Sequence, residues 1–215
     1  MGVVVRQSIK GTIMNYLGVL VGFITTFFIV TKYLTTEEVG LTRVLVDASI
    51  LLSSLAQLGT STSAMRYYPY FKDENERDHG FFGWSVLIPL IGFAFFTILF
   101  LIFKKPIENY FSQNSSLFVD YIYFVIPMAF FMMYLLVFET NSNLLMRIVI
   151  PRFIREVGIR LMTLAVYMMY AFDILNLDGM VMALCLTYGI ATILNIIYLF
   201  SLKRISFKIQ PSFIS

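Results

Sequence analysis

The sequence predicts an all-α membrane protein of six transmembrane helices, and the amino-acid composition is what predicts a membrane location. Hydrophobic residues make up 59% of the 215 residues and charged residues 13%, whereas soluble domains hold nearer half and a quarter. A spanning helix takes about 20 apolar residues. The apolar residues therefore suffice for six spans, and hydropathy divides them into six runs.

Six apolar runs are separated by polar or charged segments. They cover about residues 11–34, 39–67, 81–103, 118–138, 155–172 and 180–202. The polar residues 35–38 end the first span. A Gly and Ser/Thr cluster at 59–63 marks a weak point in the second, where we expect a kink.

Charges and a proline bound the later spans. Residues 72–79 form a charged loop before the third span, which ends at Lys104-Lys105-Pro106 because proline disfavours a helical residue before it. The polar residues 139–143 are expected to close the fourth span. The fifth is short unless its helix begins near Arg155 and its arginines snorkel to the interface.

Residues 1–215 are predicted to form a single six-span membrane lobe, and the distribution of positive charge orients it. With a cytoplasmic amino terminus, only Lys32, Arg43, Lys104 and Lys105 of the 16 Lys and Arg residues fall outside. Because cytoplasmic loops carry the excess of Lys and Arg, both termini are predicted to be cytoplasmic. The tail 208–215 is too short for another span and resembles the start of a linker.

Several function classes are excluded at this stage. One Cys and one His cannot supply a disulfide framework or a zinc site. The sequence contains neither a phosphate-binding Gly-rich loop followed by Lys-Ser/Thr nor Gly-x-Ser-x-Gly, the signatures of nucleotide hydrolysis and of serine hydrolases. The net charge of +3 is explained by cytoplasmic loops. We therefore expect no enzyme activity, no cofactor, no metal and no nucleic-acid partner.

A polar stripe runs along the second span. At 100° per residue, Arg43, Asp47, Ser54, Gln57 and Ser61 share one face of the helix. Arg43 and Asp47 are four residues apart and can form a salt bridge. At 1.5 Å per residue they lie about 6 Å and about 12 Å into the span.

Two interpretations of this stripe stay open. In the structural one, Arg43 snorkels outward with Asp47 as its partner. In the functional one, the stripe lines a water-accessible cavity, where Arg43 holds an anionic group and Asp47 orients it or carries a coupling ion. Ionisable residues inside a bilayer usually face a bundle interior or a wet cavity, which favours the functional one.

The first span has a stripe of small residues and polar side chains. Gly11, Asn15, Gly18, Gly22 and Thr26 fall within a narrow arc. The spacing of Gly18 and Gly22 favours close helix packing, with Asn15 and Thr26 as hydrogen-bonding groups. The alternative is that this stripe, Asn15 included, forms part of a cavity wall.

Two further groups of residues lie at the predicted cytoplasmic side. Arg66 begins a Tyr-rich segment typical of an aromatic belt at the membrane interface, and it is also a candidate phosphate contact at a cavity mouth. Arg147, Arg152, Arg155 and Arg160 are most simply topology determinants that contact anionic lipid head groups. A specific site for a lipid pyrophosphate is the alternative.

The segments LTTEEVGL at 34–41 and LGTSTSAMRYYP at 58–69 resemble the start of the polysaccharide-transporter proteins. These are O-antigen (Wzx-type) flippases of the multidrug/oligosaccharidyl-lipid/polysaccharide exporter superfamily. The resemblance is strongest over residues 10–80. Beyond them, only the spacing of the spans and the Arg-rich segment before the fifth helix agree.

The resemblance implies a bacterial inner-membrane protein that flips a polyprenyl-pyrophosphate-linked oligosaccharide toward the periplasm for O-antigen or capsule biosynthesis. It also implies two six-helix lobes around a cationic cavity. This chain would be the amino-terminal lobe, and a carboxy-terminal half or a homodimer mate would be the second. Arg43 becomes a candidate for the cavity wall and Arg66 for its inner gate. Unlike related lipid II flippases, the first span has no charge between Lys10 and Lys32.

Two rival functions remain. A drug exporter of the same superfamily would prefer cationic substrates and an acidic cavity. The stripe contains one acid, Asp47, and one base, Arg43, so its charge does not distinguish a drug exporter from a flippase. A membrane scaffold without a transport path would need no wet cavity. For the leading hypothesis, the expected partners are a lipid-linked oligosaccharide, membrane lipids and a second six-helix lobe.

Overall fold

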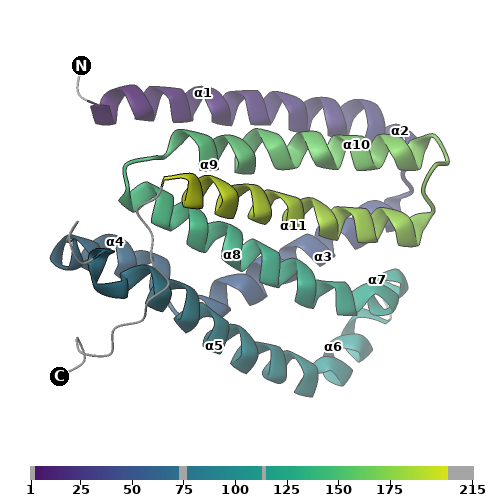
Figure 1. The fold of residues 1–215 in the computed structure, drawn as a ribbon. Helices are drawn as coiled ribbons and strands as arrows, with labels where there is room; N and C mark the ends of the chain where they lie inside the picture. The colour runs from purple at the N-terminus through teal and green to yellow at the C-terminus, as the bar shows by residue number, and fades with distance from the viewer. Residues whose placement is uncertain (1–2, 73–76, 113–114, 203–215) are drawn as a thin grey trace.

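The computed structural model describes residues 3–72, 77–112 and 115–202, and every regular element in these ranges is helical (Figure 1). The elements are α1 (Val3–Ile24), η1 (Thr25–Val30), α2 (Thr31–Tyr33), α3 (Thr36–Ala56), α4 (Thr60–Phe71), η2 (Arg77–Gly80), α5 (Phe81–Ile102), α6 (Lys104–Phe111), α7 (Ser116–Tyr121), η3 (Ile122–Phe124), α8 (Val125–Leu144), α9 (Val149–Phe153), η4 (Ile154–Gly158), α10 (Ile159–Ala171) and α11 (Leu177–Ser201). The predicted linker at 208–215 lies outside the described residues, as do Lys203, Arg204 and Lys208.

Within the described residues, five helices are long and apolar enough to cross a membrane. They are Ile9–Tyr33, Thr36–Phe71, Phe81–Ile102, Ser116–Leu144 and Leu177–Ser201. Many of their large apolar side chains are exposed, including Phe23, Leu51 and Ile91, as expected for helices that contact lipid. The predicted all-α, multi-pass membrane architecture is confirmed at this level.

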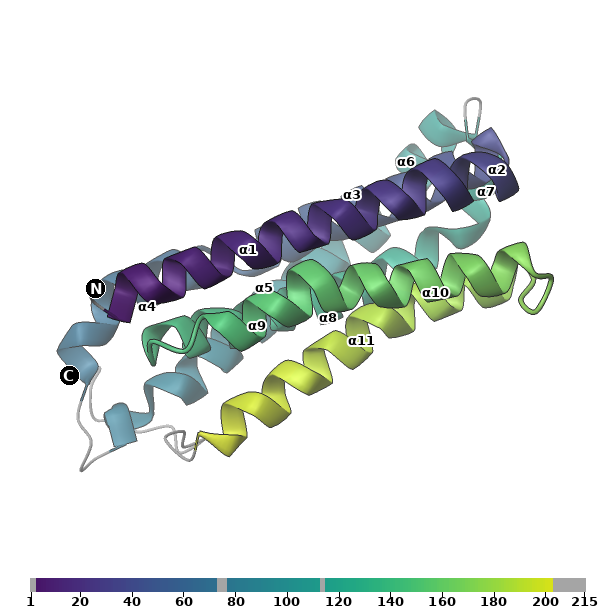
Figure 2. The ribbon, with the colours of Figure 1, turned by 90° about the horizontal axis from the view of Figure 1, so that it is seen from above.

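The segment predicted as the fifth span is a continuous helix over residues 149–171, built from α9, η4 and α10. At 1.5 Å per residue it is about 34 Å long, which is sufficient for a bilayer. Arg155, Glu156 and Arg160 make it less apolar than the five helices above. It runs alongside α1 in the views of both Figure 1 and Figure 2.

The predicted kink in the second span is present between α3 and α4. Leu58 and Gly59 there have positive φ angles of 50° and 72°, a conformation that only glycine adopts without strain. Helix α5 packs closely against this break: a Cβ on Gly92 would lie 2.1 Å from the Ala56 carbonyl oxygen. The break therefore ends the regular periodicity of α3.

The fourth span does not end where its sequence turns polar. Helix α8 continues to Leu144, and residues 139–142 are buried. Asn141 Nδ2 donates hydrogen bonds to the Val137 carbonyl at 2.8 Å and to Ser85 Oγ at 3.0 Å. The helix thus continues past the expected end of the span at 138, because Glu139 and Asn141 find partners on other helices, Arg155 and Ser85.

Helices α3, α8 and α11 form the centre of the bundle, and α5 covers one side of it. Leu41 and Leu45 of α3 pack with Val125 and Met128 of α8 and with Val181 of α11. Polar contacts also cross this interface. Ser49 Oγ donates to the Val125 carbonyl at 3.3 Å, and Thr192 Oγ1 donates to the Phe131 carbonyl at 2.8 Å.

Helix α1 contacts the rest of the bundle through its glycines. A Cβ on Gly18 would lie 2.4 Å from the Glu156 carbonyl oxygen. On Gly11 and Gly22 it would lie 2.5 Å and 2.8 Å from Nη1 of Arg152 and Arg160. The geometry confirms the close packing that the small-residue stripe predicted and identifies α9, η4 and α10 as the partner.

Candidate functional site: a cavity lined by arginines

A cavity of about 630 Å³ lies between two groups of packed helices. In the first group, α1 and η1 pack against η4 and α10; in the second, α3 packs against α8. Residues of both groups line the cavity. Its wall is of mixed polarity: Thr25, Thr42 and Thr163 line it together with Val30, Met132 and Ile159.

Three arginines reach this cavity from two sides. Arg43 comes from α3, Arg155 from η4 and Arg160 from α10, and Glu156 is the acidic residue among the lining residues. At 1.5 Å per residue, Arg160 lies about 16 Å from the start of the 149–171 helix, near its middle. The positively charged side of the cavity therefore extends to about half the length of this helix.

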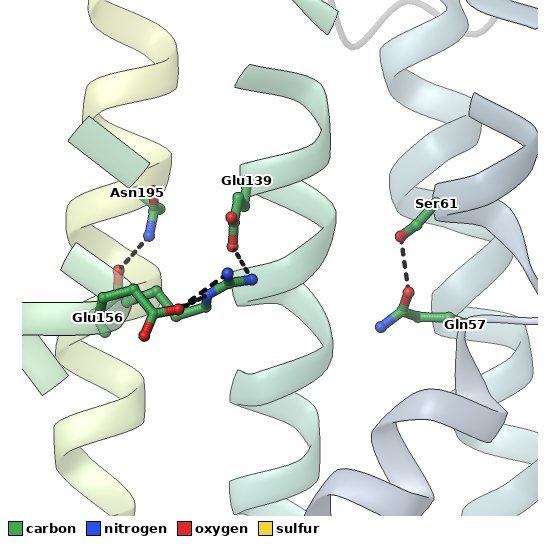
Figure 3. A network of polar contacts seen from close by, with 7 residues as sticks. Gln57, Ser61, Glu139, Glu156 and Asn195 are labelled. Atoms are coloured by element: carbon green, nitrogen blue, oxygen red, sulfur yellow. Dashed lines mark hydrogen bonds and ion pairs between the residues drawn. The ribbon is translucent and has the colours of Figure 1, made fainter. Parts of the chain in front are cut away.

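Ion pairs and hydrogen bonds hold Arg155 and Arg160, and Figure 3 shows the carboxylates of Glu139 and Glu156 directed at one guanidinium. Arg155 Nη1 lies 2.9 Å from Glu139 Oε2, and its Nη2 lies 3.1 Å from Glu156 Oε1. Arg160 Nη2 lies 3.7 Å from Glu156 Oε2, and its Nη1 donates to the Gly18 carbonyl oxygen at 2.8 Å. Because the guanidinium groups of Arg155 and Arg160 have fixed partners, this part of the cavity wall is ordered before any ligand binds.

Two π-helical segments border the cavity. Thr25 and Thr26 of η1 line it on the α1 side, and Arg155 and Glu156 of η4 line it on the other. Short π-helical turns inside α-helices occur frequently at functional sites. In η4 the turn also brings the Glu156 carbonyl oxygen next to Gly18.

The structure divides the polar stripe of the second span into three groups. Arg43 and Ser54 line the cavity. Asp47 is exposed, is not a lining residue and, within the described ranges, makes no ion pair with Arg43. Gln57 is only 6% exposed and accepts a hydrogen bond from Ser61 Oγ at 2.8 Å. This hydrogen bond bridges the helix break at Leu58 and Gly59. The break ends the 100° periodicity of α3 before Ser61, so the periodicity no longer predicts where Ser61 lies.

The other candidate residues lie away from this cavity. Asn15 is exposed on α1 and does not line it. Arg66 is exposed on α4, with its guanidinium carbon 5.7 Å from the centre of the Tyr67 ring, in agreement with an aromatic belt. Thr26 lines the cavity, as the alternative interpretation of the first stripe expected.

From the sequence, Arg155 and Arg160 are expected to contact lipid head groups, with a lipid-pyrophosphate site as the alternative, and neither Glu139 nor Glu156 is predicted as a site residue. A sequence signal for these two acids exists: Glu139 follows a long apolar run, and Glu156 stands among arginines. Ionisable residues in such segments usually pair with one another. In the structure Arg155 pairs with Glu139 inside the bundle.

The arrangement suits the binding of an anion. Guanidinium groups make paired, charge-assisted hydrogen bonds to phosphate oxygens. Among the described residues, His, Cys, Asp and Glu do not gather in a group of three that could bind a metal ion.

Comparisons of the chain with protein-family models, with curated proteins and with solved structures find no match.

Proposed function

We propose that the chain is a six-span lobe of a bacterial inner-membrane transporter that flips a polyprenyl-pyrophosphate-linked oligosaccharide for surface-polysaccharide biosynthesis. One observation carries the proposal: three arginines, Arg43, Arg155 and Arg160, line one cavity in a bundle of apolar helices. The resemblance of residues 34–41 and 58–69 to polysaccharide flippases agrees with it.

The chemistry of such a substrate matches the cavity. A pyrophosphate that links a lipid to a sugar carries a negative charge on each of its phosphates, and unpaired charge in hydrocarbon costs several kcal/mol or more. Arginines in a hydrated cavity offset that cost by charge-assisted hydrogen bonds. The apolar lipid chain can remain in the bilayer beside the lobe.

The cavity volume supports the part of the proposal that requires a second lobe. About 630 Å³ is typical of a site for a drug-sized ligand. It accommodates a pyrophosphate with its neighbouring groups, and an oligosaccharide needs more room. A second six-helix lobe facing this one, from the same chain or from a homodimer mate, would supply the opposite wall.

The packing supports a sixth span over residues 149–171. Gly11, Gly18 and Gly22 of α1 meet residues 152, 156 and 160 in the same order, so the two helices run in the same direction. This is the relation expected of the first and fifth spans in an alternating bundle. The pairing of Arg155 and Arg160 with Glu139 and Glu156 reduces the cost of burying their charges. With the bias of Lys and Arg, both termini would be cytoplasmic.

Charge favours this substrate over the cationic drug of the rival function. A cation entering the cavity would meet three guanidinium groups and the carboxylate of Glu156, which already pairs with Arg155 and Arg160. Repulsion therefore disfavours cationic substrates.

Substitution of Arg43 tests the proposal in cells that depend on this chain for surface polysaccharide. We expect Arg43→Ala to abolish or strongly reduce the polymer at unchanged protein level, because it removes one cation from the cavity wall. Arg66→Ala is the matched control, since Arg66 is an exposed arginine of the same predicted span outside the cavity. Normal polymer in the Arg43→Ala strain would contradict the proposal.

A further inference from the structure

The carboxylate of Glu139 lies behind the cavity wall. Glu139 is 3% exposed, comes from α8 and contacts Arg155 Nη1 at 2.9 Å. Figure 3 shows it pointing to the same guanidinium that pairs with Glu156. The Arg155 side chain is 36% exposed. Arg155 thus joins a buried carboxylate to the cavity.

We infer that Glu139 is an internal competitor of the transported anion: it holds Arg155 while the cavity is empty, and a phosphate group of the ligand displaces it. The inference rests on the proposed function and adds a residue that sets the affinity and selectivity of the same site. Glu139 is a positioning residue, because it acts through Arg155.

The geometry of Arg155 favours this competition. Its Nε and Nη2 donate to Glu156 Oε1 and its Nη1 donates to Glu139 Oε2. Glu156 therefore occupies the Nε–Nη2 edge of the guanidinium, and Glu139 holds Nη1 at the opposite end. Withdrawal of Glu139 frees Nη1 for a bidentate contact with a phosphate.

Glu139 is better placed than Glu156 to withdraw. Glu156 contacts both Arg155 and Arg160, so its loss would release two arginines. Arg152 lies three residues before Arg155 on the same helix, a spacing that places the two side chains on one helix face. Arg152 Nε is buried and, among the described residues, has no hydrogen-bond partner. Arg152 can therefore take over the carboxylate when Arg155 turns to the ligand.

The exchange also explains how the empty site selects its ligand. The positive charges of Arg43, Arg155 and Arg160 are offset by Glu156 in the wall and Glu139 behind it. An anion of low charge gains little by displacing a carboxylate, since one negative charge replaces another. A pyrophosphate brings more charge and more acceptors, so Glu139 raises the preference for pyrophosphate over phosphate.

The test uses the purified full chain in nanodiscs of zwitterionic lipid, with inorganic pyrophosphate and inorganic phosphate as probes in calorimetry. We expect Glu139→Gln to bind pyrophosphate about tenfold more tightly and to discriminate less against phosphate. The matched control is Glu108→Gln, whose carboxylate pairs with Lys104 at 3.0 Å in α6, outside the cavity. Unchanged or weaker pyrophosphate binding by Glu139→Gln would overturn the inference.

A second variant keeps the test decisive if Glu139→Gln does not fold. Arg152→Gln removes the cation that receives the displaced carboxylate, so we expect about tenfold weaker pyrophosphate binding. Unchanged binding by this variant would also overturn the inference. Wild-type protein that binds pyrophosphate, together with unaffected variants, would refute the role of Glu139 alone. Wild-type protein that binds neither probe would refute the anion site, and the proposed function with it.

Discussion

The contact between α1 and η4 allows a stability prediction based on one atom. A Cβ on Gly18 would lie 2.4 Å from the Glu156 carbonyl oxygen, about 1 Å short of the ordinary lower limit of 3.4 Å. This oxygen belongs to the main chain and cannot rotate away. In a Gly18→Ala variant, α1 must therefore move away from η4.

The expected cost follows from these contacts. Overpacking of a tight interface costs about 1–3 kcal/mol, and the movement weakens the 2.8 Å hydrogen bond from Arg160 to the Gly18 carbonyl. The preference of helices for Ala over Gly returns about 0.5–1 kcal/mol. We expect Gly18→Ala to lower the free energy of unfolding by about 2 kcal/mol.

Two other glycines supply the comparison. At Gly22 the nearest atom is Nη1 of Arg160, at 2.8 Å, and a flexible side chain can move; Gly22→Ala should cost less than Gly18→Ala. At Gly40 nothing lies within 4 Å, so Gly40→Ala should be neutral or slightly stabilising. Thermal unfolding of the purified variants, followed by circular dichroism, ranks them. Equal stability of Gly18→Ala and Gly40→Ala would refute the packing described here.

Two further predictions concern a charge pair and a helix cap. Arg155→Gln leaves the buried Glu139 without its closest partner and should destabilise the protein, by less than the about 3–5 kcal/mol of an uncompensated buried charge, because Arg152 can take over part of the pairing. The double variant Glu139→Gln/Arg155→Gln should recover much of this loss in thermal unfolding, and a double variant no more stable than Arg155→Gln would contradict the pairing. Thr35 accepts a hydrogen bond from the Glu38 amide at 3.3 Å and donates from its own amide to Glu38 Oε2 at 2.8 Å, a reciprocal cap of α3. Thr35→Ala should cost about 1 kcal/mol, and an unchanged unfolding temperature would count against the cap.

The spans could be predicted from the sequence because hydropathy is a local property of the chain. The long apolar runs predicted five helices of the bundle. The spacing of small residues in α1 predicted the face on which that helix packs. The end of α8 could not be predicted in this way. Glu139 and Asn141 resemble an exit into water, yet their partners, Arg155 and Ser85, lie on other helices.

The site was predictable only in part for the same physical reason. Helical periodicity placed Arg43 and Ser54 on one face, and both line the cavity. The periodicity fails beyond Leu58, whose positive φ breaks the helix before Ser61. Nothing local indicates that Arg160 turns toward Gly18, because that contact depends on how α1 and α10 pack.

The central claim is that α3 turns one face toward an aqueous space and another toward lipid. Single cysteines test it in a Cys185→Ala background, since Cys185 is the one native cysteine. A hydrophilic maleimide applied to the protein in nanodiscs reacts only where water supports the thiolate. Ser54→Cys, on the cavity wall, should be labelled. Leu51→Cys, at a side chain that is 67% exposed but outside the cavity, should not react. An unreactive Ser54→Cys, or equal labelling at both positions, would contradict the claim.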